Sequence, residues 1–271
     1  MATTVEANVR QQIGALMQRV LIVAAQPASA KLLSDLLRSI NPCQIWTATD
    51  PARALEVAAA TQPQLVFVEH DGELDGIGFT RALRRSYLAA RKSVVILVSS
   101  QATAAAIIGA RDAGAHEFLR RPYTIGDLTR RLEAVSRRSR EWIEGVDYVG
   151  PDRRRFNSGN YAGPLRRRVD HAKTPDEARI LQALRNLKAG LAALDREPRQ
   201  ALRSMRAQVD QLSCIARTRS DLVFRGAVTA LAESIARRDA ASLDRCEIER
   251  LAAPLLAFLP AEQGRRPPDA A

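Results

Sequence analysis

The sequence predicts an α/β domain with a doubly wound, five-stranded parallel sheet, followed by an all-α helical bundle domain. Three observations predict this fold class. Short apolar runs alternate with helical patterns through the first half of the chain, and only helical spacing is left in the second half. The length of 271 residues suits two domains. A composition of 46% hydrophobic and 26% charged residues is typical of globular chains.

Five strand-like runs, each followed by a helical pattern, define the first domain. Their sequences are RVLIV, CQIWTA, QLVFVEH, SVVILVS and HEFLRR. Segments such as LVFV and VVILV are apolar at successive positions, which indicates a parallel sheet covered by helices on both faces. Functional groups of such sheets gather at the carboxyl ends of the strands. The residues to inspect are therefore 24–26, 69–75, 99–100 and 120–123.

The second half repeats leucine and isoleucine at intervals of three and four residues, which is helical spacing. One such series consists of Ile180, Leu184, Leu187, Leu191 and Leu194. Breaks in the pattern divide the region into four predicted helices, at about residues 175–196, 198–217, 220–238 and 242–258. A compact four-helix bundle fits this arrangement.

The predicted domain boundaries follow these patterns. Residues 17–138 form the α/β domain, and residues 175–260 form the helical bundle. Between them, residues 139–174 contain clustered Gly, Pro and Arg without periodicity, which is typical of a linker. Residues 1–16 form an additional amphipathic helix that either packs on its own domain or pairs with a partner. We expect residues 261–271 to be a disordered tail.

The net charge of +11 is compatible with nucleic acid, an acidic membrane surface or an acidic protein as partner. The excess is local, because residues from Arg137 to Lys173 include ten Lys or Arg against five Asp or Glu. The three cysteines are odd in number and widely spaced, which indicates neither a disulfide framework nor a zinc site. The sequence has no run of ~20 apolar residues and no signal-peptide pattern, so we expect a cytoplasmic protein that does not use a membrane.

Several local sequences lie in the order typical of one signalling family. They are RVLIV followed by a turn and Pro27, the segment from Pro63 to Glu69, the pair Asp75-Gly76, and the segment from Gly114 to Pro122. Over about 120 residues, this order resembles the response-regulator receiver family. The resemblance implies a flavodoxin-like fold and a place in a two-component (phosphorelay) pathway. Receivers take a phosphoryl group from a histidine kinase onto an aspartate at the end of the third strand.

Phosphorylation of this kind needs a carboxylate nucleophile, a magnesium ion held by further carboxylates, a hydroxyl and a cation. By the resemblance, Ala24 and Ala25 stand where the family has its acidic pair, and Glu69 stands at the phosphoacceptor position. Ser99 keeps the hydroxyl, and Arg121 stands where the family has lysine. We therefore expect a degenerate pseudo-receiver that binds no metal and no cofactor and is not an enzyme.

Two interpretations of the remaining site stay open. In the first, Glu69 pairs with Arg121 near Ser99, which would imitate part of a phosphorylated site and fix one conformation. In the second, both side chains are tolerated remnants of a vestigial site. Whether Asp71, in the loop after the third strand, serves as a substitute phosphoacceptor is a further open question.

The resemblance also implies a surface for partners. Receivers dimerise or dock targets through the fourth helix, fifth strand and fifth helix, which correspond to residues from about 102 to 138. Phe118 stands at the aromatic position of that surface, and ordinary core packing is its alternative role. We therefore expect a non-catalytic protein-protein interaction or dimerisation scaffold, whose partner is a signalling protein or a second copy of the chain.

The linker contains a repeated motif, Tyr-x-Gly-Pro-x-Arg-Arg-Arg, whose two copies are 13 residues apart. Arginine clusters suit phosphate or carboxylate groups, and tyrosine rings stack on single-stranded nucleic acid. The alternatives are a linker clamped on its own domains, an acidic protein partner, and a nucleic-acid-binding regulator. The residues that would contact a partner are Tyr148, Arg153, Arg154, Arg155, Tyr161, Arg166, Arg167 and Arg168.

One segment of the helical half, Arg185-Asn-Leu-Lys-Ala-Gly, resembles the His-x-Leu-Lys-Gly signature of histidine-containing phosphotransfer domains, which are four-helix bundles. Arg185 replaces the histidine that would carry phosphate, so such a relationship would leave this domain unable to relay it. The alternative is ordinary packing of alanine- and leucine-rich helices. The family of the helical domain is left unassigned.

Overall fold

The computed structural model divides the chain into two compact units, which we describe separately. The first contains residues 1–143 and 148–163, and the second contains residues 144–147 and 164–271. Each unit has buried apolar clusters of its own, as independent domains do. The residues that the structure describes are 2–137, 140–153, 174–236, 238–239, 242 and 244–260.

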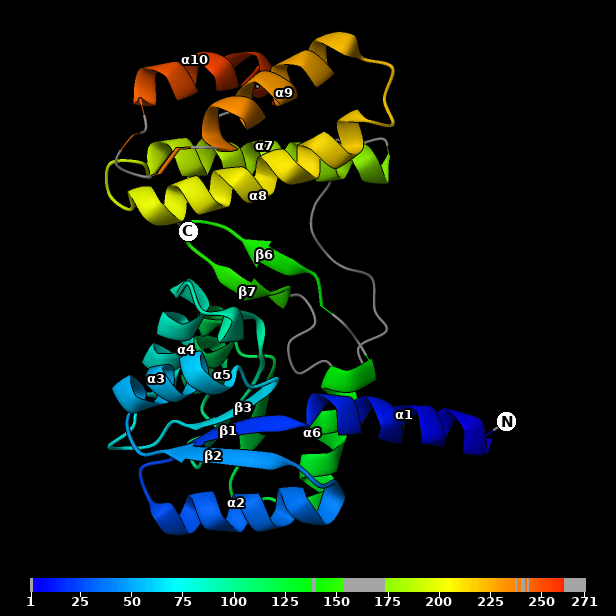
Figure 1. Cartoon of the computed structure of the whole chain (residues 1–271), viewed down its shortest axis with the longest axis vertical. Helices are drawn as coiled ribbons and strands as arrows, with labels where there is room; N and C mark the ends of the chain where they lie inside the picture. Colours follow the sequence, from blue (N-terminus) through cyan, green and yellow to red (C-terminus); the bar gives the residue numbers. More distant parts are fainter. Residues whose placement is uncertain are drawn as a thin grey trace, which may run out of the picture. The chain divides into compact units, whose positions relative to one another are not determined.

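The first unit is built on a five-stranded sheet in the order β2-β1-β3-β4-β5, and all neighbouring strands are parallel (Figure 1). The chain passes from β1 outward to β2 and then returns past β1 to β3, so the strand order reverses beside β1. The predicted flavodoxin-like, doubly wound sheet is therefore confirmed. The strands are β1 (Arg19–Val23), β2 (Gln44–Ala48), β3 (Leu65–Glu69), β4 (Val94–Ser99) and β5 (Glu117–Arg120).

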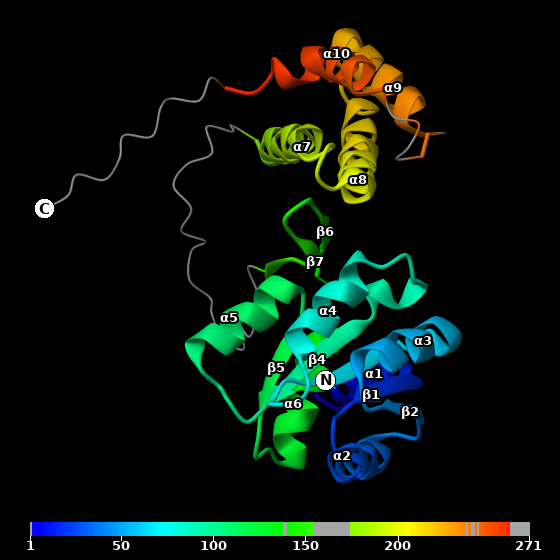
Figure 2. The same ribbon diagram turned by 90° about the vertical axis from the view of Figure 1, so that its left-hand side faces the viewer.

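Helices cover both faces of the sheet (Figures 1 and 2). Along β1, Val20 and Ile22 enter one apolar cluster, while Leu21 and Val23 enter the other, because successive strand residues point to opposite faces. The first face carries α1 (Ala2–Leu16), α2 (Pro27–Ile40) and α6 (Ile125–Arg137). The second carries α3 (Pro51–Thr61), α4 (Gly76–Arg85), α5 (Ala104–Ala113) and the short 3-10 helix η1 (Ala89–Lys92).

The start of α4 lies directly against the end of β3. Asp75 caps this helix, and its Oδ1 accepts a hydrogen bond from the Gly78 N–H at 2.9 Å. A Cβ at Gly76 would lie 2.2 Å from the Glu69 carbonyl oxygen, so only glycine permits this approach. The close contact keeps the connection between β3 and α4 short.

A two-stranded hairpin lies inside the segment that the sequence presents as a linker. β6 (Trp142–Glu144) pairs with β7 (Val149–Pro151). Tyr148 and Val149 are buried, and the Tyr148 hydroxyl donates to the Pro151 carbonyl. Strands of three residues are too short to show an alternating pattern, which is why the sequence gives no sign of them.

Arg84, at the end of α4, is fully buried near this hairpin. Its Nε donates to the Gly114 carbonyl at 2.9 Å, and its Nη1 donates to the Ser93 carbonyl at 2.8 Å. The guanidinium lies 5.5 Å from the centroid of the Trp142 ring, within cation–π range. Burial lowers the pKa of Arg84 to about 9. Arg84 thus ties α4 to the segments that enter β4 and β5.

The described residues of the second unit form four helices around one apolar core. Each helix packs on the next, and α10 also packs on α7, so the bundle is closed. The predicted helical half is confirmed. Among the described residues, no helix has the length and apolar character of a membrane span. The helices are α7 (Pro175–Ala192), α8 (Pro198–Ala216), α9 (Leu222–Ala236) and α10 (Arg245–Leu256).

A polar stripe runs along one side of α8. Gln200, Ser204 and Gln208 are buried at intervals of four residues, so they share one face of the helix. The Gln200 Nε2 donates to the Gly145 carbonyl at 2.8 Å, and the Ser204 hydroxyl donates to the Glu144 carbonyl at 3.1 Å. Residues 144–147 therefore complete the second unit by covering the polar face of α8.

Candidate functional site

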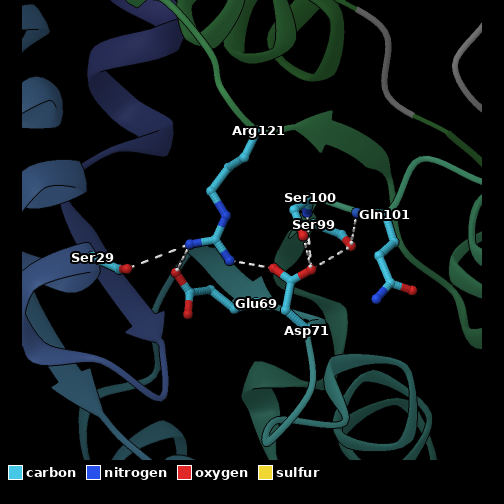
Figure 3. Close-up of polar contacts among 7 residues, drawn as sticks. All are labelled: Ser29, Glu69, Asp71, Ser99, Ser100, Gln101 and Arg121. Atoms are coloured by element: carbon cyan, nitrogen blue, oxygen red, sulfur yellow. Dashed lines mark hydrogen bonds and ion pairs between the residues drawn. The ribbon is translucent and has the colours of Figure 1, made fainter.

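The carboxyl ends of the strands bring a compact polar cluster together (Figure 3). Glu69 is the last residue of β3, Ser99 is the last residue of β4, and Arg121 directly follows β5. The parallel register aligns these ends, because Glu69 lies opposite Val98, and Ser99 lies opposite Arg120. The strand ends that the sequence marks for inspection therefore form one site.

Arg121 bridges two carboxylates at this edge. Its Nη1 donates to Oε1 of Glu69 at 2.8 Å, and its Nη2 donates to Oδ2 of Asp71. A longer contact of 3.4 Å joins Nη1 to the Ser29 hydroxyl of α2. The expected Glu69–Arg121 ion pair is present, and Asp71 joins it as a second acidic partner.

Asp71 is the acceptor at the centre of the cluster. Its Oδ1 accepts hydrogen bonds from the Ser99 hydroxyl at 3.0 Å, the Ser100 hydroxyl at 2.7 Å and the Ser100 N–H at 2.9 Å. A tight turn positions it, since the Leu74 N–H donates to the Asp71 carbonyl and Gly72 adopts a positive φ of 46°. The turn directs the Asp71 side chain back towards β4 and β5.

The pKa values of Glu69 and Asp71 are shifted in opposite directions. Burial raises the pKa of Glu69, and the neighbouring Asp71 raises it further, although Arg121 opposes both effects. Burial also acts against ionised Asp71, but hydrogen bonds from Ser100, Arg121 and Ser99 outweigh it and hold the pKa of Asp71 below its usual value. Asp71 is therefore the firmly ionised partner of Arg121.

The site does not fit a magnesium ion. Ala24 is buried at the end of β1, and the methyl groups of Ala24 and Ala25 replace the oxygen ligands that the resemblance would place there. The two carboxylates of the cluster already face the Arg121 guanidinium. Within the described part of the chain, no group of three or more His, Cys, Asp or Glu residues could hold a metal ion.

The other expected site residues lie elsewhere. Phe118 is buried in the apolar core between the sheet and the helices α3 to α5, so core packing is the role that the structure gives it. Tyr148 is only 7% exposed and Arg153 lies over its ring at 4.4 Å, so its ring is not a stacking surface for nucleic acid. Arg153 also pairs with Asp112 at 3.2 Å. The expected contact residues Arg154, Arg155, Tyr161, Arg166, Arg167 and Arg168 lie outside the described residues.

Comparison with known proteins identifies the class of the first unit. The response regulator receiver domain model matches residues 20–133. The probable chemotaxis protein CheY of Rhizobium etli is 32% identical over 118 residues, which cover 43% of this chain and 91% of that protein. The chain belongs to the response-regulator receiver family. The family match ends at residue 133, before the helical unit.

Another relative and a solved structure likewise match less than half of this chain. The KDP operon transcriptional regulatory protein KdpE of Escherichia coli is 34% identical over 125 residues, which cover 45% of this chain and 52% of that protein. The chain thus matches about half the length of that regulator. The solved structure of a response regulator receiver domain protein from Clostridium thermocellum covers 45% of this chain and 96% of its own, with 20% identity and a TM-score of 0.40.

Sequence reasoning did not identify Ser29 as a site residue. It marked Ser100 for inspection without giving it a role, and it did not identify the contacts of Asp71. The signal for Ser100 is its position directly after Ser99, a hydroxyl residue at the end of a predicted strand. The contacts of Asp71 depend on the backbone of the turn from residue 71 to 74, which no side-chain pattern encodes.

Proposed function

We propose that the receiver domain works without phosphorylation, as a protein-contact module of a two-component signalling pathway. The observation that carries this proposal is the bridge from Arg121 to both Glu69 and Asp71, at a strand edge where Ala24 and Ala25 supply no metal ligands. The proposal includes a non-enzymatic role and a cytoplasmic location, as a component of the pathway that its family defines.

The bridge disfavours both carboxylates as nucleophiles. A carboxylate attacks a phosphoryl donor through an oxygen lone pair, and the approach of that anionic donor requires positive charge that is free to bind it. Here the guanidinium of Arg121 already binds Glu69 and Asp71, while three donors from Ser99 and Ser100 occupy Oδ1 of Asp71. Asp71 is therefore a structural acceptor in this proposal, and not a substitute phosphoacceptor.

The same contacts support a fixed conformation. The Asp71 carboxylate lies between the hydroxyl of Ser99 and the guanidinium of Arg121, so it supplies anionic oxygens where those two groups would otherwise meet a phosphoryl group. Charge-assisted hydrogen bonds of this kind are stronger than neutral ones. We propose that Asp71, more than Glu69, takes the place of the phosphoryl group and holds the domain in one state.

The contact surface in this proposal lies on α5 and the start of α6. Ala104, Ala105 and Ile108 are exposed on α5, and Ile125 is exposed at the start of α6. These residues lie in the segment from about 102 to 138 that the family resemblance implies, and an apolar surface of this kind suits a protein partner.

The test is incubation of the full chain with acetyl phosphate and magnesium, followed by intact-mass measurement. We expect no phosphoryl adduct on the native chain. The matched control is a quadruple variant, Ala24→Asp, Ala25→Asp, Glu69→Asp and Asp71→Ala, which restores the family's acidic groups, releases Ser99 and Arg121 from Asp71, and should form the adduct. A stoichiometric adduct on the native chain would contradict the proposal.

A further inference from the structure

Three side chains of α8 bind the main chain of a segment that is far away in the sequence. The Ser204 hydroxyl and the Gln208 Nε2 both donate to the Glu144 carbonyl, at 3.1 and 3.0 Å. The Gln200 Nε2 donates to the Gly145 carbonyl at 2.8 Å. All three side chains are at most 5% exposed. Because every residue has a main-chain carbonyl, these contacts recognise the path of the bound segment more than its side chains.

Two side chains of the bound segment add selectivity. The Glu144 carboxylate accepts a hydrogen bond from the Gln200 Nε2 at 3.2 Å and lies 3.7 Å from the Arg203 Nε, within ion-pair distance. Val146 is buried and belongs to the apolar core of the four helices. The contacts therefore fit a loop in which an apolar residue follows an acidic residue two positions later.

Contacts inside the bundle prepare α8 for this loop. The Asn186 Nδ2 of α7 donates to the Gln208 Oε1 at 3.2 Å, which orients the Gln208 amide and leaves its Nε2 for the Glu144 carbonyl. Gln200, Ser204 and Gln208 follow one another at intervals of four residues, so the helix itself aligns their donors. Donors that are held in place before binding reduce the entropy that a ligand has to lose.

The loop that covers α8 has the properties of an exchangeable ligand. The groups that it covers are polar, so water can hydrate them when the loop leaves. Val146 is the single large apolar side chain of residues 144–147. The Gln200 Oε1 is buried and accepts no hydrogen bond from the described residues. A ligand with a donor at this position would therefore form one hydrogen bond more than the loop does.

From these contacts, we infer that Gln200, Arg203, Ser204 and Gln208 form a peptide-binding site, which we call the α8 site. Its ligand is a hairpin loop of a partner protein, with an acidic residue two positions before an apolar one. Residues 144–147 occupy the site in the same chain and act as a built-in competitor, because their covalent connection gives them a high effective concentration. The α8 site lies entirely in the second unit and does not depend on the receiver site.

Fluorescence anisotropy of a labelled peptide tests the site in the full chain. The probe is a fluorescein-labelled peptide of residues 142–151, closed into a ring by cysteines added at both ends. Glu144→Arg combined with Val146→Asp should release the loop of the protein, because it reverses the ion pair and places a charge in the apolar core. We expect this double variant to bind the probe about tenfold more tightly than the native chain, in which the loop competes.

A milder variant guards against unfolding. Val146→Ala removes part of the apolar contact and adds no charge, so it should keep the helical circular dichroism spectrum and bind the probe with intermediate affinity. If the double variant loses its helices, this variant carries the comparison with the native chain.

Further substitutions test whether the probe binds at the α8 site. In the released variant, Gln200→Ala with Gln208→Ala should weaken binding about tenfold, because the two replacements remove donors to both carbonyls. The matched control is Asp210→Asn, at an exposed position on another face of α8, which should leave the affinity unchanged. A probe with Glu144→Lys should also bind about tenfold more weakly, because it places a second cation beside Arg203.

Three results would overturn the inference: released variants that bind the probe no better than the native chain, binding that survives the loss of both glutamines, or a Glu144→Lys probe that binds as well as the original. The phosphorylation assay of the receiver site is independent of all three. Failure of one proposal is therefore distinguishable from failure of the other.

Discussion

Arg121 and Arg84 lie at opposite ends of the strands of the same sheet, and they bind different chemical groups. Arg121 lies at the carboxyl edge and pairs with the carboxylates of Glu69 and Asp71. Arg84 lies near the amino ends of β4 and β5, where it donates to the main-chain carbonyls of Gly114 and Ser93. Arg84 is fully buried, whereas Arg121 is partly exposed. From this difference we expect Arg84 to contribute mainly to the stability of the domain and, under the proposed function, Arg121 to act mainly on the conformation of the receiver site.

Replacement of Arg84 should have the largest effect. Arg84→Ala leaves buried carbonyls without donors and opens a cavity beside Trp142, so we expect the free energy of unfolding to fall by about 3–5 kcal/mol. Urea unfolding followed by tryptophan fluorescence measures this change, because Trp46 and Trp142 both lie in the first unit. Arg81→Ala, at an exposed position of the same helix, is the matched control and should change stability little.

Replacement of Arg121 should have a smaller effect on stability. Arg121→Ala leaves Glu69 and Asp71 as neighbouring carboxylates, but both retain other donors, and we expect a loss of about 1–2 kcal/mol in the same urea experiment. Arg121→Lys should recover part of this loss, since it restores the charge without the two-carboxylate geometry. If Arg121→Ala lowered the free energy of unfolding as much as Arg84→Ala, the two arginines would not differ in their contribution to stability, and the comparison would fail.

The smallest effect concerns the pH dependence of stability. Because the pKa of Asp71 is lower in the folded state than its usual value of 3.8, ionised Asp71 stabilises the folded state above that value, and the stabilisation is lost as the pH falls through the lower folded value. Asp71→Asn should therefore be less stable than the native chain at neutral pH, and the difference should shrink in acid. Urea midpoints measured between neutral pH and about pH 2.5 check this, and a difference that grows in acid would contradict it.

The fold was predictable from the sequence because its signals are local. The five apolar runs and the Asp75-Gly76 pair specify strands, turns and helix starts within short windows. The Glu69–Arg121 pair was predictable because the family resemblance places both residues at the carboxyl ends of strands, and these ends lie together in a parallel sheet. The role of Asp71 was not, because it depends on the turn at Gly72 and on how closely α4 approaches β3 at Gly76.

The structure of the hairpin and its partners illustrates a second limit. β6 and β7 are three residues each, and their stability comes from distant groups such as Arg84, which no local pattern reveals. The polar stripe of Gln200, Ser204 and Gln208 does have a visible period of four residues. Its partner, the main chain of residues 144–145, has no sequence signal, because carbonyl groups are common to all residues.

The central claim is that Asp71 and Arg121 hold the receiver site in one state. The most direct measurement is the backbone amide NMR spectrum of the full chain, titrated with magnesium and then with beryllofluoride, a mimic of the phosphoryl group. The account predicts that the amide signals of Ser99, Ser100 and Gln101 stay in place in the native chain. They should shift in the variant that combines Ala24→Asp, Ala25→Asp and Glu69→Asp with Asp71→Ala, which removes the carboxylate that binds Ser99 and Arg121. Saturable shifts of these signals in the native chain would contradict it.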